Sequence, residues 1–132
     1  MKQAILFLSA LVIALSPNLV RADNEMSGAE VLQSSSFTGE NGHEVSGGVE
    51  IVKQGDIQYL VLQDDFEFDG APDPKLGFSQ NDQFVEDSLF SGLNLDQGKQ
   101  IYRLPVGFDA TDYDEVTVWC DEFDVPLAEA KY

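Results

Sequence analysis

The only cysteine of the chain, Cys120, is the residue whose chemistry most needs an explanation. It follows the only tryptophan, Trp119, in the segment YDEVTVWCDEF, which runs from residue 113 to residue 123. Acidic residues surround it on both sides: Glu115, Asp121, Glu122 and Asp124. A lone cysteine cannot form an intramolecular disulfide, so it is a buried inert thiol, half of an intermolecular disulfide, a metal ligand or a reactive group.

The alternation of residue types before Cys120 predicts a strand with one apolar face. Val116, Val118 and Cys120 share that face, and Thr117 and Trp119 lie on the other. A buried free cysteine behaves as a small hydrophobic residue. Reactive cysteines lie beside basic groups that stabilise the thiolate, and the close sequence neighbours of Cys120 include no basic residue. The segment therefore argues against thiol–disulfide exchange.

One functional interpretation is a soft-metal site formed by Cys120 and His43. His43 is the only histidine and precedes the first strong strand signal. Carboxylates attract cations, and a bound metal deprotonates a thiol outright. One cysteine and one histidine are fewer than the three or four protein ligands of an ordinary site. Copper and no cofactor are therefore both kept as interpretations.

The other functional interpretation is one-electron chemistry at Cys120, with Trp119, Tyr113 or Tyr102 as relay groups. The structural alternative is a satisfied core thiol beside a core or interface tryptophan. An exposed Cys120 could also join two chains through an intermolecular disulfide. Solvent exposure of the sulfur distinguishes these alternatives, and the residues leave open whether the protein is an enzyme.

Acidic turns offer a calcium site as a further possibility. The segment DDFEFDG begins like an EF-hand loop, but Leu76 occupies the position where that loop has its last glutamate. Aspartates in turns more often cap the backbone than bind calcium. A non-catalytic binding or adhesion module, stabilised by calcium and with a structural buried thiol, is thus the alternative function. The aspartates in question are Asp64, Asp69 and Asp73 near one turn, and Asp109, Asp112 and Asp114 near another.

Two strands joined by the Gly-containing turn KQGD are predicted between residues 43 and 70. The second strand places four large apolar side chains on one face: Leu60, Leu62, Phe66 and Phe68. The segment therefore predicts a β-hairpin with a Gly-containing turn.

The rest of the chain reads as short strands separated by turns. Strands are predicted at 76–78, 99–105 and 115–123, a long connection at 79–100, and one helical turn or a loose lead-in at 23–36. Helical periodicity is weak past the leader. We therefore predict an all-β fold, an antiparallel β-sandwich or a barrel-like domain with long loops and little helix.

The N-terminal residues 1–22 have the layout of a secretory signal peptide: a basic start, an apolar run and a small-residue exit at Ala22. We expect residues 23–132 to form one exported domain, periplasmic or secreted. That part of the chain has 24 acidic against five basic residues. Such a charge excludes nucleic acid and anionic membranes as partners. A protein redox partner or a surface protein is expected instead.

An ordered set of motifs resembles the DM13 domain family and covers nearly all of residues 23–132. The motifs are FTGENGHEVSGGVEI (37–51), LVLQDDF (60–66), APDPKLGF (71–78), GKQIYRLP (98–105) and the segment 113–130 that contains Trp119 and Cys120. The resemblance implies a β-sandwich-like fold and a role in electron transfer or redox chemistry. It also implies that Cys120 is the suspected active residue. In some relatives the domain accompanies DOMON and cytochrome b561-type modules.

Overall fold

The computed structural model describes residues 26–132, so the predicted signal peptide lies outside the described residues. Within that range, no helix has the length and apolar character to cross a membrane. The described elements are β1 (Glu30–Ser36), β2 (Thr38–Gly39), β3 (Val45–Ser46), β4 (Gly48–Gln54), β5 (Ile57–Leu62), β6 (Glu67–Phe68), β7 (Pro74–Gln80), β8 (Gln83–Val85), η2 (Glu86–Ser88), β9 (Ser91–Gly92), β10 (Gln100–Arg103), η3 (Ala110–Asp112), β11 (Glu115–Cys120) and β12 (Val125–Lys131).

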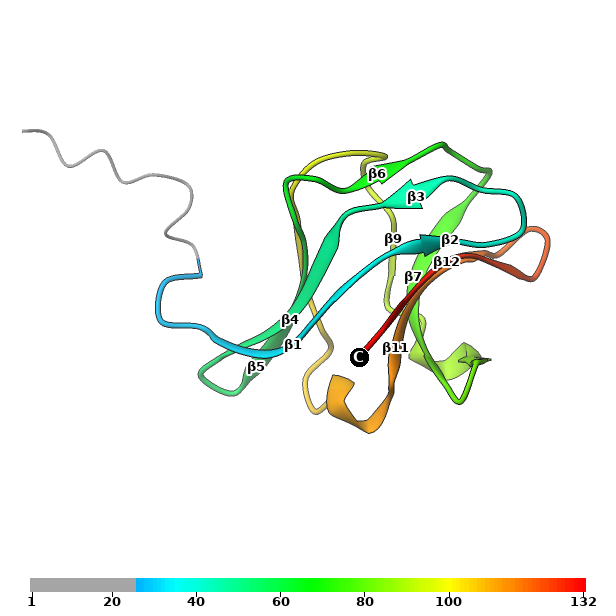
Figure 1. Ribbon diagram of the computed structural model, residues 1–132. Helices are drawn as coiled ribbons and strands as arrows, with labels where there is room; N and C mark the ends of the chain where they lie inside the picture. The colour runs from blue at the N-terminus through cyan, green and yellow to red at the C-terminus, as the bar shows by residue number, and fades with distance from the viewer. Residues whose placement is uncertain (1–25) are drawn as a thin grey trace, which may run out of the picture.

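Two antiparallel sheets form the domain (Figure 1). The smaller sheet has the order β1-β4-β5-β10, and the larger has the order β2-β12-β11-β7-β8, with β9 paired to β7. A short β3–β6 ribbon joins their upper ends in Figure 1. The sheets do not close into a barrel, so the prediction of an all-β sandwich is confirmed.

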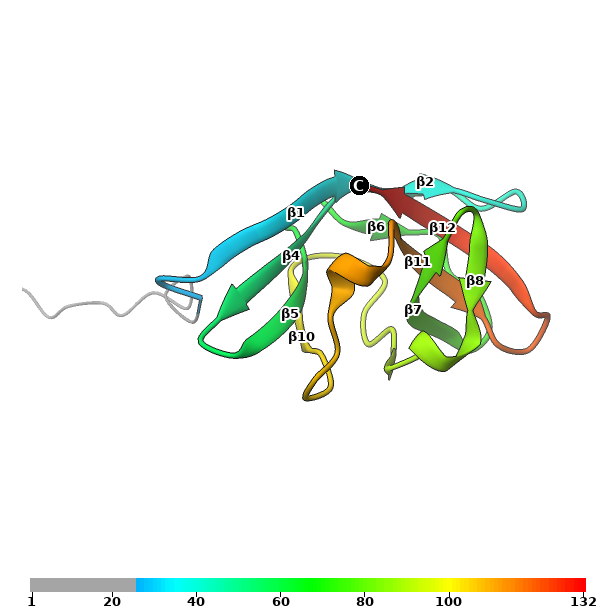
Figure 2. The ribbon, with the colours of Figure 1, turned by 90° about the horizontal axis from the view of Figure 1, so that it is seen from below.

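The chain passes from one sheet to the other at Phe37, the single residue between β1 and β2. The end of β1 thereby lies against the end of β12, where the Ser35 hydroxyl donates to the Lys131 carbonyl. Figure 2 shows this junction beside the C-terminus.

The core fills the space between the two sheets. The apolar face predicted for the β5 region is confirmed, since Leu60, Leu62 and Phe66 are fully buried. Phe78 on β7 and Val118 on β11 meet them from the larger sheet. The predicted KQGD hairpin is also confirmed: Gly55 takes a positive φ of 60° in the turn between β4 and β5.

Three local predictions differ from the structure. Residues 30–36 form β1 instead of a helical turn or a loose lead-in, because their backbone pairs with β4. The predicted long connection contains β8, which pairs with β7 through a two-residue turn. The last predicted strand ends at Cys120 instead of Phe123, because Asp124 adopts a positive φ of 50° in a turn that leads into β12.

Candidate functional site

Cys120 is the last residue of β11 and lies in the core. Its exposed fraction is 1 %, and its Sγ atom is 3.5 Å from the Pro72 carbonyl oxygen, to which the thiol donates. β11 is paired on both sides, with β7 and with β12, so no edge of the strand is open at this sulfur. The predicted apolar face of Val116, Val118 and Cys120 is thus confirmed.

Trp119 lies on the opposite face of β11 and stacks on Phe84 of β8. The ring centroids are 4.1 Å apart and the planes differ by 8°. Gly77 leaves the space for this stack, because a Cβ atom there would lie 2.9 Å from the Phe84 ring. The two rings border a surface pocket of about 640 Å³ that also includes Asp82 and Glu129. The strand that carries Cys120 in the core therefore also carries, on its other face, an aromatic ring that borders a surface pocket.

Tyr113 and Tyr102 belong to a different aromatic group. The Tyr113 ring stacks on Phe108 with centroids 5.3 Å apart and planes 7° apart. Both rings pack on Phe78, and Phe90 connects Phe78 to Tyr102 with centroid separations of 5.8 and 6.4 Å. Burial raises the pKa of Tyr102, and its hydroxyl donates to Gln100. The structure brings the two tyrosines into one core cluster and leaves Trp119 outside it.

His43 lies between β2 and β3 and pairs with Asp69. The distance from Nδ1 to the carboxylate is 2.9 Å. The Glu44 backbone N–H, and then the His43 ring, lower the pKa of Asp69. Cys120 has Pro72 as its polar contact, so the two predicted soft-metal ligands contact different residues. Within residues 26–132, neither belongs to a group of three or more metal-ligating side chains.

Four of the six aspartates considered for calcium have side-chain partners within the protein, and Asp69 is the one already described. Asp73 pairs with Lys75 at 2.9 Å. Asp109 caps the η3 turn by accepting from Thr111, whose hydroxyl is the largest cause of the lowered pKa of Asp109. Asp114 accepts from the Asn81 N–H. These contacts fit the capping role that aspartates usually have in turns.

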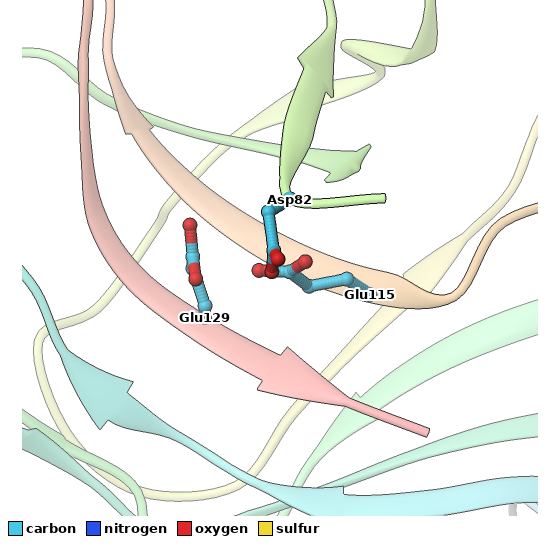
Figure 3. A group of neighbouring side chains, drawn as sticks. All are labelled: Asp82, Glu115 and Glu129. Carbon is cyan, nitrogen blue, oxygen red and sulfur yellow. The ribbon is translucent and has the colours of Figure 1, made fainter. Parts of the chain in front are cut away.

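A different acidic group lies on the outer face of the larger sheet. Glu115 of β11, Glu129 of β12 and Asp82 of the β7–β8 turn place carboxylate oxygens within 4.8 Å of one another (Figure 3). From the sequence, Glu115 was recognised only as an acidic neighbour of Cys120. The available signal was a glutamate on the polar face of a strand otherwise made of valine, threonine, tryptophan and cysteine.

Glu115 is the unusual member of this acidic group. It is 1 % exposed, and its Oε1 atom has no hydrogen-bond partner. Burial, and then the neighbouring Glu129 carboxylate, raise the pKa of Glu115 to about 8. The Lys131 ammonium forms an ion pair with Asp82 at the exposed edge of the group. A buried carboxyl with a free oxygen is costly unless a proton or a cation satisfies it.

Comparison with known families identifies the domain. The model of the family described as "Electron transfer DM13" matches residues 36–132. The chain belongs to the DM13 family. No curated protein and no solved structure matches the chain.

Membership of the DM13 family supports a general redox or electron-transfer role for this chain. The matched region contains Trp119, Cys120 and the acidic group, and it takes in only the last residue of β1. Strand β11 thus carries a buried thiol on one face and the outer group of carboxylates on the other.

Proposed function

We propose that this DM13 domain is an exported electron-transfer protein in which Cys120 is the redox group. The Trp119–Phe84 stack is its connection to the surface. One observation carries the proposal: Trp119 precedes Cys120 on β11, and its ring stacks at 4.1 Å on a second ring at a surface pocket. An electron then has a short path across one strand.

The burial of Cys120 decides between two kinds of sulfur chemistry. Thiol–disulfide exchange needs an attacking sulfur to reach the thiol, and a sulfur that is 1 % exposed is closed to that attack. Electron transfer makes no bond between donor and acceptor. In the proposed step the oxidised Trp119 ring takes one electron from Cys120, and the S–H bond breaks. The Trp119 ring returns to its reduced state, having first lost one electron to the redox partner, which is the oxidant. The thiol, whose S–H donates to the Pro72 carbonyl in the closed core, loses its proton to water on local opening of the strand end.

The partner we infer is a redox protein with a basic docking face. The pocket beside the Trp119–Phe84 stack is lined by Asp82, Glu86, Asp124 and Glu129. The whole chain carries a formal charge of −17. Opposite charges on two partners raise their association rate at low ionic strength. Export through residues 1–22 would place the encounter in the periplasm or outside the cell.

The second candidate function is a non-catalytic binding module with a structural thiol. Its support is the same burial of Cys120 among core residues, which a purely structural cysteine also requires. On this interpretation the pocket binds a surface protein and the sulfur takes no part. Replacing the sulfur would then leave the chemistry of Trp119 unchanged.

Flash oxidation of the protein separates the two functions. A photogenerated ruthenium(III) tris-bipyridyl complex oxidises surface tryptophan, and the chain has a single tryptophan, so the transient radical absorbance reports Trp119 alone. We expect that radical to decay at least tenfold faster in the native protein than in Cys120→Ala. Trp119→Phe controls for oxidation elsewhere and should show no tryptophan radical. Equal decay with and without the sulfur would reject the relay and favour the binding module.

Copper is tested in the same protein. A Cu(I) titration of the native protein and of His43→Gln asks whether a metal binds at Cys120. Stoichiometric Cu(I) binding that is lost in both Cys120→Ala and His43→Gln would replace the metal-free relay with a copper site. Absence of such binding supports the organic relay.

A further inference from the structure

Three carboxylates converge on the outer face of the larger sheet from separate parts of the chain. Glu115 lies on β11, Glu129 on the neighbouring β12, and Asp82 in the turn of the β7–β8 hairpin. Oxygen atoms from all three lie within 4.8 Å of one another, as Figure 3 shows. The β11–β12 register sets this geometry, because Thr117 pairs with Glu129 and leaves the two glutamates diagonal on one face.

Glu115 supplies the observation that points to a ligand. Its side chain is buried, its Oε1 atom has no hydrogen-bond partner, and it is directed toward the other two carboxylates. Buried polar atoms are nearly always satisfied by a donor, a water molecule or an ion. The neighbouring Thr117 hydroxyl does not fill this role, since it bonds to Ser79 at 2.5 Å. A cation between the carboxylates would satisfy the free oxygen.

We propose that Asp82, Glu115 and Glu129 bind one hard divalent cation of the calcium class. Carboxylate oxygens are the ligands that calcium, magnesium and manganese prefer, and the group has no cysteine or histidine that would favour copper or zinc. Water molecules complete the coordination. They have access, because Asp82 and Glu129 line the larger surface pocket, and Asp82 and Glu115 line a smaller one.

Lys131 is the competing cation in the protein itself. It pairs with Asp82, but its side chain is 63 % exposed and that of Asp82 is 70 % exposed. Exposed lysine pairs are weak and exchange readily with solvent, so the ammonium can leave when a divalent ion binds. Lys131 also lies directly opposite Glu115 in the backbone register of β11 and β12. Its positive charge near the carboxylates opposes binding of a divalent cation. Removing that charge should therefore tighten binding.

The bound ion would add a link at the β7–β8 turn to strands that are already joined by strand pairing. It would tie the β7–β8 turn to β11 and β12, and that hairpin carries Phe84, the partner of Trp119. The Cys120 thiol lies on the other face of β11 and takes no part. The site shares Asp82 and Glu129 with the proposed docking face. Cation binding is measured without a redox partner and does not involve the thiol, so the two proposals can fail separately.

Isothermal titration with calcium chloride, with thermal melting as a second readout, tests the proposal on the chelator-treated protein. We expect one saturable site and a higher melting temperature in calcium than in chelator. Glu115→Gln and Glu129→Gln should each weaken binding at least tenfold. Lys131→Gln should strengthen it several-fold. Glu122→Gln removes the same charge from an exposed turn outside the group and should bind like the native protein.

Other outcomes overturn the proposal. The first is a native protein that folds normally and shows neither saturable binding nor a melting shift with calcium, magnesium or manganese. Glu122→Gln could weaken binding as much as Glu129→Gln, which would show diffuse attraction to an acidic surface. Zinc or copper could bind more tightly than all three hard cations. Circular dichroism checks that each variant is folded, and the partly exposed Glu129 keeps the test valid if Glu115→Gln fails to fold.

Discussion

Trp119 and Cys120 are adjacent in the chain but have opposite environments. The Trp119 ring faces a surface pocket, and the Cys120 sulfur is enclosed between the two sheets. Strand β11 thus separates the surface pocket beside Trp119, which a partner protein can approach, from the Cys120 sulfur, which a partner cannot contact. Such an arrangement suits electron transfer better than covalent sulfur chemistry, because electrons cross a strand and bulky reagents do not.

The enclosure of Cys120 predicts slow labelling of its thiol. A disulfide reagent such as dithiobisnitrobenzoate should react with the folded protein at least 100-fold more slowly than with the protein in guanidinium chloride, because opening of the core must come first. The increase of thionitrobenzoate absorbance measures the rate. The control is the double variant Cys120→Ala, Glu122→Cys, in which the thiol is exposed. Labelling of native Cys120 at the rate of that control would contradict the enclosure.

At the scale of elements, the β7–β8 hairpin organises the outer face of the larger sheet. Its turn consists of Asn81 and Asp82 with φ values of 52° and 61°. Its second strand brings Phe84 over Gly77 and onto Trp119. A single two-residue turn therefore positions both the aromatic stack and one carboxylate of the acidic group.

Gly77→Ala should disturb this hairpin. The new Cβ atom would lie 2.9 Å from the Phe84 ring and 3.2 Å from the Ser88 hydroxyl, so the ring must move. We expect a loss of about 1–2 kcal/mol in the free energy of unfolding and a shift in the Trp119 fluorescence maximum as the stack opens. Urea unfolding followed by fluorescence measures both.

Gly92→Ala is the matched control for Gly77→Ala. Gly92 lies in β9, which pairs with β7. A Cβ atom added at Gly92 would have the Pro74 carbonyl oxygen as its nearest neighbour, at 4.0 Å. This substitution should leave the Trp119 fluorescence unchanged. Equal spectral shifts in the two variants would show that the Phe84 contact does not depend on the space above Gly77.

The elements also show what the sequence could predict. The hairpin of β4 and β5 and the apolar face of β11 were predictable, because alternation and a Gly turn are local signals. β1 was not, since its SSS segment lacks alternation and becomes a strand only by pairing with β4. The acidic group was not predictable either. Asp82, Glu115 and Glu129 meet only when the register of three strands and the fold of the hairpin are known.

At the scale of the whole molecule, the burial of Glu115 beside Glu129 makes stability depend on pH. The ordinary pKa of a glutamate carboxyl is 4.5. In the folded protein, burial is the largest cause and Glu129 the second of a rise in the pKa of Glu115 to about 8. Asp82 opposes ionisation as well, and Lys131 favours it. At pH values between these two pKa values, the Glu115 carboxyl keeps its proton in the folded state and has lost it in the unfolded chain.

The free energy of unfolding of the chelator-treated protein should fall as the pH rises from about 5 to about 8. Between those values the folded state binds more protons than the unfolded state, so stability decreases with pH and then levels off. The raised pKa of Glu115 corresponds to about 4 kcal/mol across the window. Lowered pKa values at Asp69 and Asp109 act at more acidic pH, and the raised values at Lys131 and Tyr132 act at more alkaline pH.

Glu115→Gln isolates this contribution. The amide has nearly the shape of the protonated carboxyl and cannot ionise, so the variant should match the native protein near pH 5 and exceed its stability at pH 9. Urea unfolding at one-unit pH intervals in chelator gives the two curves, and Glu122→Gln, which changes an exposed carboxylate, should follow the native curve. Parallel curves for Glu115→Gln and the native protein from pH 5 to pH 9 would mean that Glu115 ionises normally. That result would contradict the burial of the Glu115 carboxyl without a partner for its Oε1 atom.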